Sequence, residues 1–379
     1  MKQGRIDYVG WLGHGNTGDE AIHLANQMIF SQYQLVPYNV RGRTHRINLF
    51  GGGTVLPVWV LKILPGRYNY AFGVGVRDPA FWGNFHPFVI ELVRRFSFRF
   101  LGVRDKVSEE LLNKWGIDSE VIGDPCLLLE PNSYKKEDRK VVGVNVGPFC
   151  EKIWGNDHRR VLIEMIRVCK LIKRDGYYPI LIPFWKDDIP YVKTISEAAN
   201  VSIFENWENI QDVLDFIASC HVLIGEKLHS IIFGASTYTP FLSIEYSPKC
   251  RSFSEIMGFD EYVIRTDEIV AESVLNLFHD LLENWNQMRS RLIGKVEMYR
   301  ERLREFATHI VDDIESLPDD MWSPQSLWKS VIYKVAYGKD IFLYDRIKPI
   351  WKAWYQLPVR KDVEHWMDLL LTSIGESIR

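Results

Sequence analysis

Short apolar runs alternate with amphipathic stretches along the first third of the chain. Alternation of this kind predicts βαβ units that build a parallel sheet. We expect strands at residues 6–12, 46–50, 70–76 and 98–103, and helices at residues 20–30 and 105–115. These elements predict a Rossmann-like domain over residues 1–130.

The next ten residues, 131–140, are almost all polar and predict a linker. The alternation then resumes with expected strands at residues 141–146, 180–183, 221–224 and 241–245, and helices near 159–173, 210–219, from 228 onward and near 251–257. They predict a second Rossmann-like domain over residues 141–275. Two such domains facing a cleft are the arrangement of the GT-B class. The expected fold class is therefore α/β and GT-B-like, with two parallel sheets.

The remaining chain has a different pattern. From Leu281 to Phe306 apolar side chains recur every three or four residues, which predicts a long amphipathic helix within residues 276–320. Residues 321–379 carry nine Lys and Arg against six Asp and Glu, together with five Trp. This basic aromatic helical appendage could rest on an anionic membrane surface, or it could pack on the domains or on a partner subunit.

Composition narrows the class of partner and the compartment. The net charge is only -3, so nothing in the overall balance favours nucleic acid. No apolar run is long enough to span a membrane, and the N-terminus lacks the apolar region of a secretory signal. The five cysteines are widely spaced without a CxxC pair, which disfavours a zinc site or a disulfide framework. We expect a cytoplasmic protein, with peripheral membrane contact through 321–379 as an option, and neither a metal nor a cofactor.

A glycine-rich loop, residues 13–20 (GHGNTGDE), lies between the first expected strand and helix. Its glycines match GxGxxG and would expose amide groups at a helix N-terminus, which suits an anion. No acidic residue ends a second strand about twenty positions later, so we do not expect a dinucleotide. Asn16, Gly18 and Asp19 are candidates for an anion or acceptor loop. The alternative is a tight turn in which Asp19 or Glu20 caps the helix dipole.

Two more strand ends of the first domain should lie at the same edge. Gly52 and Gly53 follow the strand at 46–50, and Arg104 follows the strand at 98–103. Ligands of α/β proteins bind at the carboxyl ends of strands. The guanidinium of Arg104 could clamp a carboxylate or phosphate with two hydrogen bonds, or it could pair with Asp105.

The strongest candidate for chemistry is the segment 225–230 (GEKLHS), which links the strand at 221–224 to a helix of small residues. A lysine, an imidazole and a hydroxyl within four residues of a helix N-terminus predict an anion site with a titratable group beside it. We therefore expect His229 to be catalytic.

A second group of polar residues follows the strand at 241–245. Glu245, Tyr246 and Lys249 could reach a ligand from there. Glu245 could also orient His229 or pair with Lys227, and the residues alone leave these options open.

The chain resembles the polysaccharide pyruvyl transferase family at these residues. The similar stretches run in the family's order and include residues 15–21 (GNTGDEA), 51–53 (GGG), 73–75 (GVG), 103–105 (VRD), 123–125 (GDP), 228–230 (LHS) and 245–250 (EYSPKC). The resemblance covers roughly residues 6 to 265. It implies a GT-B-like fold and transfer of a pyruvyl group from phosphoenolpyruvate to two hydroxyls of a sugar. The products would be a cyclic ketal and phosphate, with phosphoenolpyruvate as the only co-substrate.

The resemblance also implies roles for individual residues. His229 would be the catalytic acid or base, and Lys227, Leu228 and Arg104 would contact the donor. The family usually has Arg where this chain has Lys227, and lysine offers a point charge without the planar fork. With this resemblance, we expect the domain over residues 1–130 to be the acceptor side and the domain over residues 141–275 to hold the donor site. The full candidate donor site consists of Arg104, Lys227, Leu228, Ser230, Glu245 and Lys249.

The expected chemistry agrees with these residue types. Phosphoenolpyruvate needs a proton at its methylene carbon, which an imidazole can deliver, and cations can hold its carboxylate and phosphate. The acceptor would be a sugar of a surface polysaccharide or of its lipid-linked precursor. One alternative is a GT-B glycosyltransferase that uses a nucleotide sugar, because the same fold serves both donors. Another is a carbohydrate-binding protein without catalysis, for which Lys227 is the only indication.

Overall fold

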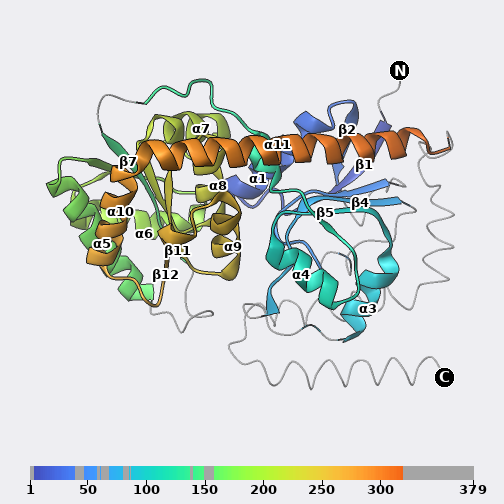
Figure 1. Ribbon diagram of the computed structural model, residues 1–379, viewed down its shortest axis with the longest axis horizontal. Coiled ribbons are helices and arrows are strands. Elements are labelled where there is room, and N and C mark those ends of the chain that lie inside the picture. The colour runs from blue at the N-terminus through green and yellow to red at the C-terminus, as the bar shows by residue number, and fades with distance from the viewer. Residues whose placement is uncertain are drawn as a thin grey trace. The chain divides into compact units, whose positions relative to one another are not determined.

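The computed structural model describes residues 4–38, 47–57, 60, 68–79, 85, 87–136, 140–148 and 158–318 (Figure 1). By its contacts the chain divides into residues 1–323 and residues 324–379. The appendage expected at 321–379, with its option of membrane contact, lies outside the described residues, as does Cys150. The other four cysteines are buried free thiols.

The first sheet has six parallel strands in the order β2-β1-β3-β4-β5-β6. The strands are β1 (Gly4–Val9), β2 (Tyr33–Pro37), β3 (Ile47–Phe50), β4 (Tyr68–Val74), β5 (Phe98–Val103) and β6 (Glu120–Val121). The accompanying helices are α1 (Thr17–Ile29), α3 (Pro87–Phe96), α4 (Lys106–Lys114) and the short η2 (Pro125–Leu128). Every residue of β3 is buried, as expected for a strand covered on both faces.

The second sheet also has six parallel strands, in the order β12-β11-β10-β7-β8-β9. The strands are β7 (Val141–Asn145), β8 (Tyr178–Leu181), β9 (Ser202–Ile203), β10 (Val222–Gly225), β11 (Phe241–Glu245) and β12 (Val263–Arg265). The helices are α5 (His158–Arg174), η3 (Lys186–Asp188), α6 (Ile189–Ala199), α7 (Ile210–Ser219), α8 (Leu228–Ser236), α9 (Pro248–Met257) and η4 (Asp260–Tyr262). The expected α/β class with two parallel sheets is confirmed.

Strand order fixes where a ligand can approach. In the first sheet β1 lies between β2 and β3, so the strand order changes direction at β1: β2 is on one side of it, and β3 and the later strands are on the other. In the second sheet the reversal is at β7, which lies between β8 and β10. Loops at such switch points separate and leave a crevice at the carboxyl ends of the strands. The loops after β1, β3, β7 and β10 are therefore the ones to inspect.

The helix expected from Leu281 onward is two helices, α10 (Ala271–Glu283) and α11 (Trp285–Glu315). Leu281 belongs to α10. The helical path is interrupted at Asn284, whose side chain donates a hydrogen bond to the Asp280 carbonyl. The apolar stripe of α11 is buried as predicted, at Met288, Leu292, Val296, Tyr299, Leu303 and Phe306.

α11 contacts elements that belong to both sheets (Figure 1). The buried guanidinium of Arg300 donates to the carbonyls of Leu127 in η2 and Ser236 in α8, at 2.7 and 3.0 Å. Near the end of the helix, Asp313 accepts a hydrogen bond of 2.5 Å from Tyr70 of β4. This helix therefore joins the two halves of the molecule.

The described part of residues 131–140 forms neither helix nor strand. The domain limits at residues 130, 141 and 275 stay predictions. None of the helices in the described part of the chain combines the length and apolarity that a membrane span requires.

Candidate active site

The segment 225–230 is held in a fixed conformation at the end of β10. Gly225 has no side chain, and a Cβ there would lie 2.3 Å from the hydroxyl of Ser230. That hydroxyl donates to the Lys227 carbonyl at 2.6 Å, and the Lys227 amide donates to the Asn145 side chain at 2.9 Å. Leu228 and Ser230 are both buried, and the Ser230 hydroxyl supports the start of α8. Their contact with the donor stays a prediction.

His229, the second residue of α8, lies against the first residues of α1. A Cβ at Gly18 would come within 2.1 Å of the imidazole Nδ1, so only glycine fits this position. Asn16 caps α1 and accepts hydrogen bonds from the amides of Gly18 and Asp19, at 3.0 and 3.4 Å. The loop amides expected to bind an anion are thus satisfied by a side chain of the protein.

The Glu20 carboxylate also accepts a hydrogen bond from the Gly13 amide at 2.6 Å. Asn16 is the N-cap residue of α1, while Asp19 and Glu20 both lie in its first turn, where their negative charge complements the helix dipole as we considered.

Asp124 faces the other side of the imidazole and was not among the site residues expected from the sequence. Its Oδ2 lies 3.8 Å from His229 Nε2. Both atoms are buried, and neither has a hydrogen-bond partner among the described residues. Its Oδ1 accepts from the Cys126 amide at 3.0 Å, which fixes the carboxyl at the start of η2. Burial raises the pKa of Asp124, and Arg104 opposes that rise.

Three cations determine the protonation of His229. Burial lowers the pKa of its imidazole well below 6.5, and Arg104, Lys249 and Lys227 lower it further. The imidazole is therefore neutral at pH 7 in the free protein.

The two candidate donor-binding cations, Arg104 and Lys249, meet at this edge. Arg104 is buried and donates from Nε to Asp105 at 3.0 Å, which is the pairing we considered. Its guanidinium also packs on Gly75, where a Cβ would lie 2.7 Å from Cζ. Lys249 lies 4.9 Å from the centre of the Tyr246 ring. Burial and the charge of Arg104 lower the pKa of Lys249 to about 8.

Asp19 supplies a second titratable group. Its carboxylate packs against Gly53, where a Cβ would lie 2.6 Å from Oδ1 and where φ is +53°. Burial raises the pKa of Asp19 to about 7, although Lys249 and Arg104 oppose the rise. Gly52 packs on the backbone of Gly10, so both glycines of this strand end serve close packing.

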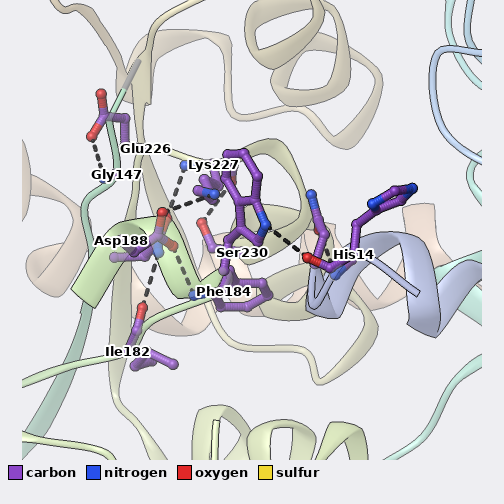
Figure 2. A network of polar contacts seen from close by, with 12 residues as sticks. His14, Gly147, Ile182, Phe184, Asp188, Glu226, Lys227 and Ser230 are labelled. Atoms are coloured by element: carbon purple, nitrogen blue, oxygen red, sulfur yellow. Dashed lines mark hydrogen bonds and ion pairs between the residues drawn. The ribbon is translucent and has the colours of Figure 1, made fainter. Parts of the chain in front are cut away.

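The Lys227 side chain reaches Asp188, at the end of the short helix η3 (Figure 2). Its ammonium lies 2.9 Å from Asp188 and 4.8 Å from the centre of the Trp185 ring. The other oxygen of Asp188 accepts from the Phe184 amide at 2.9 Å. Neighbouring Glu226 accepts from the Gly147 amide at 2.9 Å, and burial raises the pKa of Glu226 to about 8.

The Glu245 carboxylate forms an ion pair with Arg251, at 2.8 Å, which was not a partner that we considered. Its contact with a ligand stays a prediction. In the sequence, Glu245 and Arg251 are six residues apart, on either side of the start of α9. Oppositely charged residues at this spacing are too common to predict an ion pair.

One triad in the described part of the chain could offer atoms to a metal. Atoms of Asp124, Cys126 and His229 lie within 4.8 Å of one another. Burial and Asp124 raise the pKa of the Cys126 thiol well above its ordinary value, whereas a metal needs the thiolate. The cations near His229 also repel a divalent ion. The arrangement therefore fits proton transfer better than metal binding.

A small pocket opens beside Lys249, between residues of both sheets. Its lining consists of Thr54, Val76, Asp78, Asp105, Val107, Ser247 and Lys249. The pocket places hydroxyls, carboxylates and one cation around a space next to Arg104's partner, Asp105.

Comparison with known proteins decides the family. A family model described as polysaccharide pyruvyl transferase matches residues 16–248. The chain belongs to this family. The matched stretch contains Arg104, Asp124 and His229, ends one residue before Lys249 and excludes α10 and α11.

Individual relatives are distant. The chain is 26% identical over 84 residues to the amylovoran biosynthesis protein AmsJ of Erwinia amylovora, which is 22% of this chain and about a fifth (20%) of that protein. A UDP-GlcNAc 2-epimerase from Neisseria meningitidis, solved with UDP-GlcNAc, aligns with a TM-score of 0.50 and 10% identity over 83% of this chain and 100% of its own. A functionally uncharacterised Klebsiella pneumoniae protein aligns at 14% identity with a TM-score of 0.40, over 68% of this chain and 92% of its own. The likeness to the epimerase confirms the GT-B-like fold.

Proposed function

We propose that this chain transfers a pyruvyl group from phosphoenolpyruvate to a sugar of a surface polysaccharide or of its lipid-linked precursor. The products would be a cyclic pyruvate ketal and phosphate. The observation that carries the proposal is His229, held between Gly18 and Asp124, with a buried Nε2 that has no hydrogen-bond partner among the described residues. It lies in a segment that the pyruvyl transferase family model matches.

The charges around His229 suit this donor. Phosphoenolpyruvate carries a carboxylate and a phosphate, and Arg104 and Lys249 supply the matching positive charge. Within the described part of the chain Arg104 bonds to Asp105 through Nε, so the outer nitrogens of its fork can bond to an anion. The pKa of Lys249, lowered to about 8, keeps most of its ammonium charged at pH 7.

Donor binding would also change the protonation of His229. Its pKa is depressed partly by three cations, and the negative charges of the donor offset them. The pKa of the imidazole should therefore rise in the complex, so that it can take a proton from a sugar hydroxyl and pass it on. Of the two protons that the hydroxyls release, one goes to the methylene carbon and the other to the departing phosphate. Asp124, 3.8 Å from Nε2, would stabilise the imidazolium.

The test is phosphate release from phosphoenolpyruvate. The acceptor is surface polysaccharide of the encoding organism, freed of acid-labile ketals by mild acid and cut to oligosaccharides. We expect release only when donor and acceptor are both present. A general acid or base contributes about 10²- to 10⁴-fold, so His229→Asn should lower kcat by that factor. His279→Asn is the matched control, because His279 is an exposed histidine paired with Asp175.

Other outcomes would point elsewhere. Full turnover by His229→Asn would exclude the proposed role of this residue. Thermal stabilisation by UDP, GDP or CMP sugars but not by phosphoenolpyruvate would favour a glycosyltransferase. Saccharide binding without phosphate release from any donor would favour a binding protein.

A further inference from the structure

Three aromatic side chains cluster beside the candidate active site. Trp11 and His14 lie in the loop between β1 and α1, and Trp185 lies between β8 and η3. The ring centres of Trp11 and His14 are 4.8 Å apart, and those of Trp11 and Trp185 are 6.1 Å apart. Trp11 is 38% exposed, and His14 is exposed as well. We call Trp11, His14 and Trp185 the aromatic cluster.

The aromatic cluster is held rigidly because the two sheets exchange hydrogen bonds beneath it. The Trp185 indole donates to the His14 carbonyl at 3.0 Å, a bond drawn at His14 in Figure 2. The backbones of Asn16 and Trp185 form an isolated antiparallel bridge, and the Thr17 amide donates to the Phe184 carbonyl at 2.9 Å. A tryptophan surface fixed in this way loses little conformational entropy when a ligand stacks on it.

The aromatic cluster lies close to His229 through the loop that carries Trp11 and His14. Asn16 of this loop forms the bridge with Trp185, and Gly18, two residues later, lies against the His229 imidazole, since a Cβ there would be 2.1 Å from Nδ1. A molecule that rests on the aromatic cluster is therefore close to the proposed catalytic side chain.

We propose that the aromatic cluster is the subsite on which a pyranose ring of the acceptor saccharide stacks. This inference rests on the proposed function and names the acceptor side of the same site. A pyranose has an apolar face of C–H bonds, and the face of an aromatic ring carries partial negative charge that attracts them. Trp11 and His14 leave apolar ring surface in solvent beside the site, which in soluble proteins commonly marks a ligand site.

The two substrates are thereby separated by their chemistry. Phosphoenolpyruvate is small and strongly anionic, with no apolar ring face, and it fits Arg104 and Lys249. A neutral sugar needs no countercharge, and the indole of Trp11 carries none. The Lys227 ammonium, 4.8 Å from the centre of the Trp185 ring, is paired with Asp188.

The test measures acceptor and donor separately, with the ketal-free oligosaccharides described above. Trp11→Ala should raise the acceptor KM about tenfold, the loss expected for one aromatic stack of about 1.4 kcal/mol. The KM for phosphoenolpyruvate should not change, and Trp11→Phe should restore most of the acceptor affinity. Tyr178→Ala is the control, because Tyr178 is another exposed aromatic residue, 42% exposed at the start of β8.

Calorimetric titration with the same oligosaccharides separates this inference from the proposed function. Binding that Trp11→Ala weakens, without phosphate release, supports the subsite and contradicts pyruvyl transfer. Normal turnover with an unchanged acceptor KM in Trp11→Ala overturns the subsite and leaves pyruvyl transfer intact. Absence of saccharide binding by the unaltered protein at millimolar concentration, or Trp11-dependent binding of uridine in place of sugar, also overturns the subsite.

Discussion

Lys227 and His229 are two residues apart at the start of α8, yet their side chains have different partners. His229 lies against Gly18 of α1 and Asp124 before η2, whereas Lys227 pairs with Asp188 of η3. The backbone explains the difference. Lys227 is the residue before the helix, with extended torsions (φ -72°, ψ 138°), and His229 already follows the helical path. A change of backbone conformation between them sends their side chains apart.

Their electrostatic surroundings differ in the same way. The Lys227 ammonium has a buried carboxylate at 2.9 Å, while the nearest carboxylate oxygen to His229 is 3.8 Å away and unpartnered. Lys227 still acts on His229 at a distance, because its charge lowers the imidazole pKa. A cation inside a catalytic segment can thus tune the site without binding the substrate.

The variant Lys227→Met tests most directly whether Lys227 pairs with Asp188 and does not bind the donor. Removing the lysine leaves Asp188 as an uncompensated buried carboxylate, which typically costs about 3–5 kcal/mol. We expect a loss of that size in the free energy of unfolding, measured by urea denaturation. The KM for phosphoenolpyruvate should change little.

A second variant distinguishes pairing from donor binding. Lys227→Met with Asp188→Asn removes both charges, and Asn can still accept from the Phe184 amide, so most of the stability should return. A Lys227→Met protein of unchanged stability whose donor KM rises tenfold or more would show that Lys227 binds the donor, as the resemblance implies.

The next largest effect concerns the His229 side. Asp124→Asn removes the negative charge beside the imidazole, while the amide oxygen can still accept from the Cys126 amide. We expect kcat to fall about 10- to 100-fold, or about 1.4–2.7 kcal/mol. Without the carboxylate the imidazolium is less favoured, so the limb of the kcat profile that reports His229 should move to lower pH. The pH profile of phosphate release measures both effects.

A purely structural role for Asp124 would give a different result. Stability would fall while the position of the pH limb stayed constant. His279→Asn again serves as the control, since its ion pair with Asp175 is remote in sequence and exposed.

The fold was predictable wherever strands are buried on both faces. The limits predicted for β5, β11 and α7 agree with the structure, because long apolar runs end at clear turns. The missed strands β2, β6, β9 and β12 are the edge strands of the two sheets. β9 has two residues, and no residue of β12 is fully buried, so neither leaves a run of apolar positions.

The sequence predicted where the site lies, but not how its side chains are arranged. Arg104 and His229 follow strands, and the carboxyl ends of parallel strands meet at one edge. The directions of side chains were not predictable, because they depend on contacts between distant segments. His229 against Asp124, and Lys227 against Asp188, are such contacts. Glu245 illustrates the limit, since its actual partner Arg251 was not among the options that the sequence suggested.

The smallest expected effect belongs to Glu226, which precedes Lys227 and lies on the same side. Burial raises the pKa of its carboxyl from 4.5 to about 8. Below pH 4.5 both folded and unfolded chains hold this proton. Between pH 4.5 and 8 only the folded chain holds it, so the contribution of Glu226 to stability becomes less favourable as pH rises, and it levels off above pH 8. Glu226→Gln removes this penalty and keeps an oxygen for the Gly147 amide.

The stability of Glu226→Gln relative to the unaltered protein should therefore be about 1 kcal/mol greater at pH 6 than at pH 5. Urea denaturation of both proteins at the two pH values measures this difference. Glu208→Gln, at an exposed position, should show no such gain. Because Glu226 belongs to the Lys227 side, the pH limb of kcat should stay where it is. A shift of that limb in Glu226→Gln would mean that the two sides share protons, and the separation between Lys227 and His229 would then be wrong.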